Sequence, residues 1–197
     1  DYCEVVERLA DCDVDLLEIN ISCPNVKEGG IAFGQNAGRV EEITAEIKKR
    51  AKQSVIMKLS PNVTDITEMA KAAEAGGADA LSLINTLTGM KIDVHRRTFA
   101  LANKTGGLSG PAIKPVAVRM VYQTANAVKL PIIGMGGIRN AEDALEFIMA
   151  GAKMVAVGTA NFMCPTAACE VAEGIRQYMT AYGIEDINTL IGCVNDR

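Results

Sequence analysis

The residues best suited to chemistry lie in one short segment, Asn20-Ile-Ser-Cys-Pro-Asn25, where two carboxamides flank a thiol. A carboxamide donates and accepts hydrogen bonds at once, which suits a small ligand that carries a carboxylate and ring amides. A thiol can act as a general base once it is deprotonated. Most lone cysteines are instead small buried apolar residues, so the residue types alone leave Cys23 open to both interpretations.

A lysine and a second polar pair follow further along the chain. Lys58 interrupts the apolar run 55–59, and a lysine in a buried strand is costly unless it meets an anion or a polar ligand. Beside the N1 atom of a flavin, a lysine would stabilise the negative charge of the reduced ring. The alternative is a strand-end lysine whose ammonium reaches solvent. Asn85-Thr86 could bind the polar edge of a substrate or simply begin a turn.

Glycines recur where a strand is predicted to give way to a helix. Gly110 closes the segment Gly106-Gly-Leu-Ser-Gly110, and the pairs Gly136-Gly137 and Gly158-Thr159 each follow an apolar run. Glycine lets the backbone approach a ring or a phosphate closely, and backbone N–H groups at such turns bind phosphate. Each pair alone is a weak signal that also fits an ordinary loop before a helix, but two on consecutive turns form a stronger one.

These residues have to be positioned by strands and helices that alternate along the chain. A helix is expected to end near residue 10, and apolar runs predict strands at 15–21, 54–59, 79–84, 131–135 and 153–157. Amphipathic segments predict helices at 39–52, 64–76, 112–128, 140–150 and 165–182, with N-caps at Thr64 and Asn140. The polar, glycine-rich stretch 86–110 is interpreted as an active-site loop inserted into this alternation.

The alternation favours a parallel sheet covered on both faces, within a single domain over residues 1–197. An open sheet concentrates its ligand at one switch point. A TIM barrel brings all its strand ends to one mouth and binds phosphate after strands seven and eight. Because polar or glycine residues follow every strand, we predict an α/β protein with a (β/α)8 TIM barrel, of which this chain supplies approximately strands 4–8 and their helices. The natural protein is then expected to be longer at its N-terminus, or to be completed by a missing segment.

Composition disfavours several classes of protein. The chain has 197 residues, a net charge of −4 and 49% hydrophobic residues, which suits one globular domain with a substantial core. Its mild acidity gives no electrostatic reason to expect nucleic acid or an anionic membrane as a partner. No apolar run approaches the roughly 18 residues that a membrane span needs. The six cysteines form no CxxC pair, so neither a metal site nor a disulfide scaffold is expected. The same cysteine pattern predicts a cytoplasmic location.

Taken together, several segments resemble those of class 1 dihydroorotate dehydrogenases, in the same order and at fitting spacings. They are NISCPN, KLSPN, INT, GGLSGPAIKP, GMGGI and VGTA. The resemblance implies a (β/α)8 barrel that binds FMN at its C-terminal mouth and oxidises (S)-dihydroorotate to orotate in pyrimidine synthesis. By position it makes Cys23 the base that takes the C5 proton, while the C6 hydride passes to the flavin.

The resemblance also implies which residues hold the two ligands. The substrate would be bound by the polar side chains of Asn20, Asn25, Asn85 and Thr86. The FMN ring and phosphate would be held by Asn20, Lys58, Ile84, Gly110, Gly136, Gly137, Gly158 and Thr159. No residue is assigned to a metal.

The stretches NVKEGGIAFG and INTLTGMKID are more similar to the class 1B catalytic subunit than to class 1A. Class 1B implies a homodimer within a heterotetramer, whose second subunit carries FAD and a 2Fe–2S cluster and passes electrons to NAD+. The cysteines of this chain do not suit such a cluster, which assigns it to the partner. The alternatives are a class 1A enzyme that reduces fumarate without a partner, the pyrimidine-reducing domain of dihydropyrimidine dehydrogenase, and a truncated, non-catalytic barrel fragment that holds no flavin.

Overall fold

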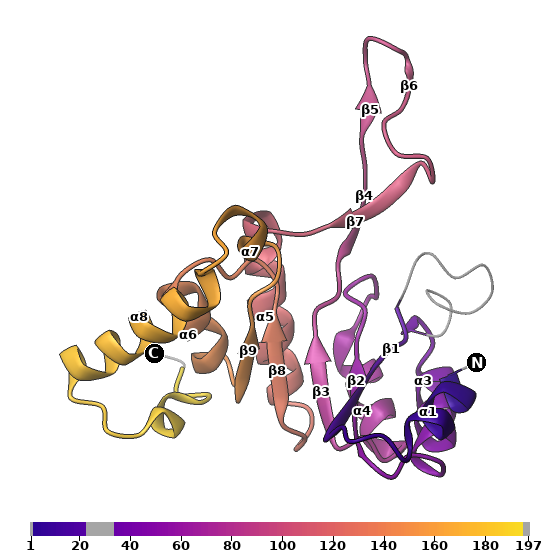
Figure 1. Cartoon of the computed structure of the whole chain (residues 1–197), viewed down its shortest axis with the longest axis horizontal. Helices are drawn as coiled ribbons and strands as arrows, with labels where there is room; N and C mark the ends of the chain where they lie inside the picture. The colour runs from indigo at the N-terminus through magenta and orange to yellow at the C-terminus, as the bar shows by residue number, and fades with distance from the viewer. Residues whose placement is uncertain (1, 23–33, 195–197) are drawn as a thin grey trace.

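The computed structural model describes residues 2–22 and 34–194. At its centre lies a five-stranded sheet whose strands are all parallel and stand side by side in chain order (Figure 1). The strands are β1 (Leu16–Asn20), β2 (Ser54–Lys58), β3 (Ala80–Leu83), β8 (Ile132–Met135) and β9 (Met154–Ala156). Each predicted strand is present with its ends within one residue, so the α/β class is confirmed.

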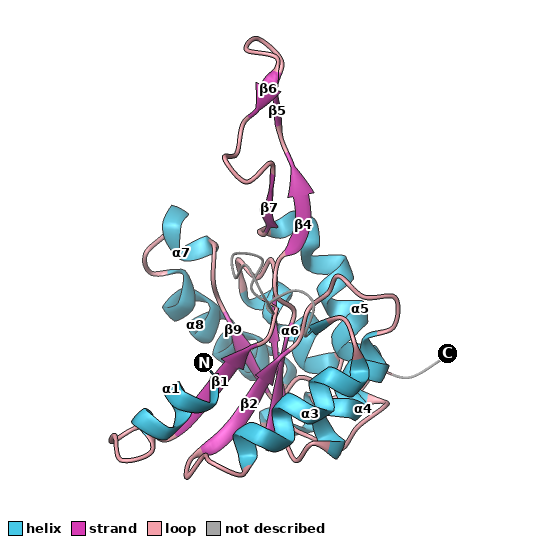
Figure 2. Ribbon diagram, turned by 90° about the vertical axis from the view of Figure 1, so that its right-hand side faces the viewer, coloured by secondary structure: helices cyan, strands magenta, loops and turns pink. Residues whose placement is uncertain are grey.

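The helices pack against one another in the same order as the strands. They are α1 (Tyr2–Leu9), α3 (Ala37–Lys48), α4 (Ile66–Ala75), α5 (Lys114–Ala125), α6 (Ala141–Met149) and α8 (Ala167–Tyr182). In Figure 2, α3, α4, α5 and α6 lie on the same side of the sheet, whereas α1 and α8 flank its two edges in Figure 1. Right-handed crossovers between strands in chain order bring all the connecting helices to one face.

In the described residues, helices therefore cover one face of the sheet. Strand β1 shows the consequence, since buried and exposed side chains alternate along it. Leu17 and Ile19 face the helices and are buried, whereas Leu16 on the other face is 53% exposed. We call this second face of the sheet, which carries Glu18 and Lys58, the inner face.

The hydrophobic core fills the space between the sheet and the helices. Phe147 of α6 is its largest fully buried side chain. Its ring packs closely against β8, because a Cβ added to Gly134 would stand 2.7 Å from the Phe147 Cδ1 atom. A glycine at this strand position lets the aromatic ring approach the backbone closely. The strands are thereby held at a fixed distance from the helices.

One of the two predicted helix caps is confirmed. Asn140 begins α6, where its side chain accepts a hydrogen bond of 2.9 Å from the backbone N–H of Asp143. The predicted cap at Thr64 is wrong by one position, because Asp65 caps α4 and accepts a hydrogen bond from the Thr67 N–H. The positive end of the helix dipole further stabilises the negatively charged Asp65 carboxylate, whereas the neutral Thr64 hydroxyl would receive no such stabilisation.

The stretch 86–110 is not a loop throughout. Strand β4 (Leu87–Met90) pairs with β7 (Thr105–Leu108), and β5 (Ile92–Asp93) pairs with β6 (Thr98–Phe99), both antiparallel. Together they form an arm that stands out from the body in both ribbon views (Figures 1 and 2). The strands of this arm were not predicted from the sequence, because the β7 sequence TGGL is rich in glycine, which is rare in strands.

The C-terminal part differs from prediction in its details. The predicted helix 165–182 begins at Ala167 and is preceded by the short helix α7 (Ala160–Met163). The 3-10 turn η1 (Pro111–Ile113) leads into α5, and η2 (Ile187–Leu190), which was not predicted, packs against α6. Within residues 2–22 and 34–194, no helix has the length and hydropathy to cross a membrane.

The packing of the core predicts that two phenylalanines differ strongly in their contribution to stability. Phe147 is fully buried, whereas Phe162 of α7 is 90% exposed. We expect Phe147→Ala to lower the free energy of unfolding of the full-length protein by about 3–5 kcal/mol, from lost burial and the cavity left behind. Phe162→Ala should change it by no more than about 0.5 kcal/mol. Urea unfolding of both variants measures the difference, and equal losses would contradict the packing described.

Candidate functional site

A cavity of about 660 Å³ opens at the carboxyl ends of the parallel strands. Its volume lies in the range of small-molecule and cofactor sites. Parallel strands in register bring their carboxyl ends to the same rim, so residues far apart in the chain meet there. The predicted site residues that line the cavity are Lys58, Ile84, Asn85, Thr86, Gly110, Gly136, Gly137, Gly158 and Thr159. Cys23 and Asn25 lie outside the described residues.

Asn20 joins this set through a hydrogen-bonded polar cluster. Asn85 Nδ2 donates to Asn20 Oδ1 at 2.9 Å and to Ser22 Oγ at 2.6 Å. Asn20 Oδ1 also accepts hydrogen bonds from the backbone N–H and the hydroxyl of Ser22, both at 3.2 Å. Because the Asn20 oxygen is committed to these donors, its amide N–H₂ group is the part suited to meet a ligand.

Asn62 extends the cluster from the end of β2. Its Nδ2 donates to the Thr86 carbonyl at 3.1 Å, and its Oδ1 accepts from the Thr88 N–H at 2.9 Å. These bonds fix the start of the arm and the backbone beside Thr86. Asn62 is not among the site residues predicted from the sequence, although it ends the KLSPN segment. Its position after a strand end, matching that of Asn85, was the available signal.

Lys58 lies at the end of β2 and lines the cavity. Its Nζ donates to Glu18 Oε1 on the neighbouring strand at 3.1 Å. The side chain of Lys58 is 21% exposed, so it is paired within the cavity rather than extended into solvent. Glu18 was missed by the sequence analysis, although the alternation of Leu17, Glu18 and Ile19 indicates a polar inner face for β1.

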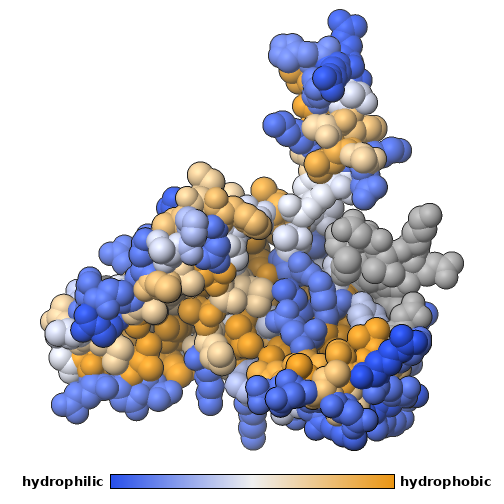
Figure 3. Space-filling view, viewed as in Figure 1, coloured by the Kyte–Doolittle hydropathy of each residue, from blue (hydrophilic) through white to orange (hydrophobic). Residues whose placement is uncertain are grey.

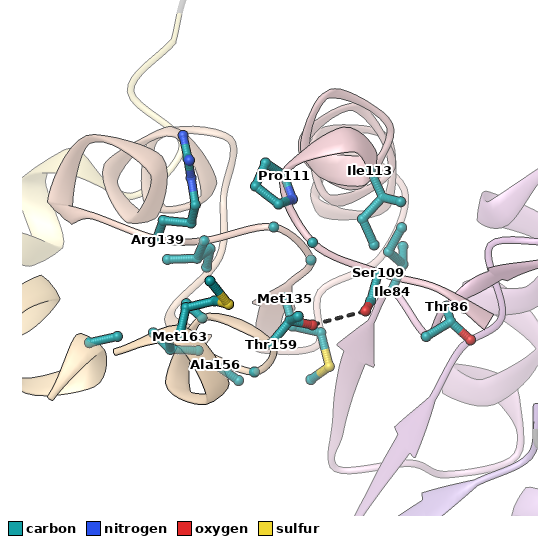
Figure 4. A pocket seen from close by; sticks show the side chains of 18 of the residues that line it. Ile84, Thr86, Ser109, Pro111, Ile113, Met135, Arg139, Ala156, Thr159 and Met163 are labelled. Carbon is teal, nitrogen blue, oxygen red and sulfur yellow. Dashed lines mark hydrogen bonds between the residues drawn. The ribbon is translucent and has the colours of Figure 1, made fainter. Parts of the chain in front are cut away.

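The glycine turns form the side of the cavity towards α5 and α7 (Figure 4). Gly136 and Gly137 have φ angles of 130° and 85°, which side chains other than glycine rarely adopt. A Cβ on Gly137 would stand 2.8 Å from the Gly110 carbonyl oxygen, so these two turns pack directly together. The Thr159 hydroxyl donates to the Ser109 hydroxyl at 2.9 Å and links the turn after β9 to the segment before α5.

A partly buried ion pair holds two of these turns in place. Lys114, which begins α5, donates to Asp143 Oδ1 at 2.6 Å and also pairs with Glu146. The second Asp143 oxygen accepts from the Arg139 N–H at 2.9 Å, directly after the Gly136-Gly137 turn. Burial by itself would raise the pKa of the Asp143 carboxyl. The hydrogen bonds from Lys114 and the backbone outweigh it and hold that pKa below the usual value of an aspartate.

The side chains that could bind a metal ion are not grouped in the described part of the chain. Across residues 2–22 and 34–194, no three His, Cys, Asp or Glu side chains are grouped as a metal site would require. Cys164 lines the rim, where its thiol contacts Thr166 and Glu170. The arrangement therefore offers amide and backbone donors, one lysine ammonium and glycine turns, which suit an organic ligand bearing a carboxylate or a phosphate.

Comparisons with known proteins agree on one family. A family model described as dihydroorotate dehydrogenase matches residues 1–179. The chain is 75% identical over 194 residues to the dihydroorotate dehydrogenase B (NAD(+)) catalytic subunit of Lachnoclostridium phytofermentans, covering 98% of this chain and 65% of that protein. The corresponding protein of Alkaliphilus oremlandii is 67% identical over 192 residues, covering 98% and 64%. The chain thus spans less than two thirds of the length of these curated relatives.

A solved structure extends the likeness to the fold. The crystal structure of DHODH from Eimeria tenella in complex with ferulenol superposes with a TM-score of 0.81 at 25% sequence identity. The match covers 98% of this chain and 57% of that chain.

The ion pair beside the glycine turns makes a testable prediction. Asp143→Asn removes a charge-assisted hydrogen bond, and we expect it to lower the free energy of unfolding of the full-length protein by about 2 kcal/mol at neutral pH. Because the pKa of Asp143 is depressed in the folded state, this stabilisation is present above about pH 4 and is lost as the pH falls through the folded value. The matched control is Glu142→Gln, an exposed charge in the same helical turn. Denaturant titrations at pH 7 and pH 3 should show the difference between wild type and Asp143→Asn shrink at pH 3. A difference that does not change with pH would contradict the role of the carboxylate.

Proposed function

Since the chain belongs to the dihydroorotate dehydrogenase family, we propose that it oxidises (S)-dihydroorotate to orotate with bound FMN, in the synthesis of pyrimidines. The observation that supports this most strongly is that Asn85, which is hydrogen-bonded to Asn20, lines the same cavity as Lys58 and the glycine turns. A small polar substrate and a phosphate-bearing cofactor could both be held there.

The residues present fit FMN. Gly110 and Gly158 both line the cavity, and a Cβ on either would meet nothing within 4 Å, so side chains there would fill space that a cofactor needs. We assign the phosphate to the backbone of the Gly136-Gly137 and Gly158-Thr159 turns. The ring would lie beside Lys58, Ile84, Gly110 and Asn20. When bound, FMN supplies the acceptor for the hydride that leaves C6 of the substrate.

The polar cluster suits the substrate. Dihydroorotate offers a carboxylate and ring amides, which need donors and acceptors together. Asn20 contributes its amide N–H₂ group, because its oxygen already accepts hydrogen bonds from Asn85 and Ser22. Asn85 and Thr86 line the cavity, and Asn25 completes the proposed set. Hydrogen bonds among Asn20, Ser22 and Asn85 hold these three residues in one arrangement before any ligand arrives.

Cys23 is the proposed base that removes the C5 proton. It lies outside the described residues, and its assignment rests on the family motif and on its neighbours in the chain. Ser22, which precedes it, is buried and accepts the 2.6 Å hydrogen bond from Asn85. Cys23 therefore follows directly after a residue that belongs to the polar cluster.

The electron acceptor is proposed to be NAD+, reached through a partner. The relatives carry the name dihydroorotate dehydrogenase B (NAD(+)), catalytic subunit, which implies a separate electron-transfer subunit for those proteins. We propose the same for this chain, with FAD and the 2Fe–2S cluster on the partner and a homodimer at the centre of a heterotetramer. The cytoplasmic location stays a prediction, as does the absence of nucleic-acid and membrane partners.

We further propose that the five strands are strands four to eight of a (β/α)8 barrel, with residues 1–197 as the C-terminal part of one domain. Two features support this. Leu16 and Met154, on the inner face at opposite edges of the sheet, are 53% and 61% exposed. Broad apolar areas also lie on the body in Figure 3. Further strands would cover such side chains, and a complete barrel usually takes about 250 residues.

The base assignment predicts the behaviour of a serine variant. Cys23→Ser in the full-length protein should keep the yellow colour of bound flavin but bleach it with dihydroorotate at least about 100-fold more slowly at neutral pH, because a hydroxyl is a far weaker acid than a thiol. Stopped-flow absorbance measures the rate. Cys12→Ser, an exposed cysteine outside the cavity, is the matched control and should react like wild type. An unchanged rate in Cys23→Ser would exclude this thiol as the base.

The choice of acceptor predicts a second result. The full-length protein should form orotate with NAD+ only when the partner subunit is added, and should turn over slowly with fumarate alone. Rapid turnover with fumarate alone would contradict the class 1B assignment and favour class 1A. A colourless purified protein with no flavin absorbance band would instead contradict the FMN proposal.

A further inference from the structure

We propose that Glu18 is a positioning residue that holds the Lys58 ammonium in the cavity and, by compensating its charge, sets the midpoint potential of bound FMN. This inference rests on the proposed function, since it requires FMN in this cavity. It assigns a role to a residue that the family motifs did not single out.

The pair is built into the sheet by the strand register. Lys58 stands beside Asn20 across the β1–β2 pairing, and Glu18 lies two residues before Asn20 on the same face. Lys58 Nζ therefore reaches back along the inner face to Glu18 Oε1, at 3.1 Å. Both side chains line the cavity, and they are 21% and 37% exposed. An ion pair on the open surface contributes little free energy. The Glu18–Lys58 pair is half-enclosed, so dissolved salt screens the attraction between its charges less.

Charged side chains are few around this cavity. In the part of the chain that the structure describes, its lining contains the cations Lys58 and Arg139 and the anions Glu18 and Glu170. Glu170 belongs to α8, where it accepts a 2.6 Å hydrogen bond from the Thr166 hydroxyl. The Arg139 side chain extends away from the Ser109–Thr159 hydrogen bond in Figure 4. Glu18 is thus the carboxylate that balances Lys58.

Charge compensation has a defined consequence for a redox ligand. Charges near the flavin ring tune its electronics, and a lysine there favours the reduced, more negative form. Glu18 opposes that effect while it fixes the ammonium in place. A unit charge about 10 Å away, at an effective dielectric constant of about 20, changes an equilibrium by roughly tenfold. Removing the Glu18 charge while keeping its hydrogen bond should therefore favour reduced FMN.

The first measurement is the two-electron midpoint potential of FMN in the full-length protein. Glu18→Gln keeps an oxygen that accepts from Lys58 but removes the negative charge. We expect reduced FMN to gain about tenfold in relative affinity, which corresponds to a rise of about 30 mV for two electrons. Glu170→Gln is the matched control, because it removes the same charge from the same cavity without touching Lys58. It should shift the potential by less than a third as much.

The second measurement does not depend on flavin. Competitive acetylation followed by peptide mass spectrometry reports how accessible each lysine is, with Lys114 as an internal reference, since it is held in a separate ion pair. Glu18→Ala should make Lys58 react several-fold faster, whereas Glu18→Gln, which keeps a hydrogen-bond acceptor for the ammonium, should raise the rate less. Equal rates for Lys58 in wild type and Glu18→Ala would overturn the anchoring role.

The outcomes separate this inference from the proposed function. Flavin bound in wild type, with an unchanged or lower potential in Glu18→Gln, would overturn the role of Glu18 and leave the FMN assignment standing. Equal upward shifts in Glu18→Gln and Glu170→Gln would also overturn it, because any cavity charge would then suffice. A full-length protein without flavin would overturn the proposed function and with it the redox role of Glu18.

Discussion

The parallel register of the five strands is the constraint on which the rest of the structure depends. It aligns the carboxyl ends of β1, β2, β3, β8 and β9 along one rim. The two-residue period of a strand then separates its side chains. Leu17 and Ile19 enter the core against the helices, while Glu18 and Asn20 turn towards the inner face. A shift of one residue would exchange the two sets and abolish both core and cavity.

Hydrogen bonds from the chain itself account for how the rim keeps its shape. The side-chain oxygens of Asn20, Asn62 and Asn85 each accept such a bond, which for the half-buried Asn62 and Asn85 offsets the cost of removal from water. Asp143 does the same on the other side of the cavity, where it joins α5 to the turn after β8. These contacts fit the proposed site, because the binding of a substrate beside a cofactor would need donors held in fixed positions.

Much of the fold could be predicted from local pattern. Apolar runs located every strand of the central sheet to within one residue, because burial against helices demands such runs. The cap at Asn140 followed from its side-chain chemistry. The arm was missed because its β7 strand contains the pair Gly106-Gly107, and pairing with β4 rather than intrinsic preference makes it a strand.

The sequence by itself determined the α/β class, the strands and the motifs that end them, since these depend on residues adjacent in the chain. Only the tertiary structure decided which side chains meet. Lys58 pairs with Glu18, 40 positions away, and Asn85 donates to Asn20, 65 positions away. Such contacts arise from strand order and register, which are set by the packing of the whole sheet rather than by any local pattern.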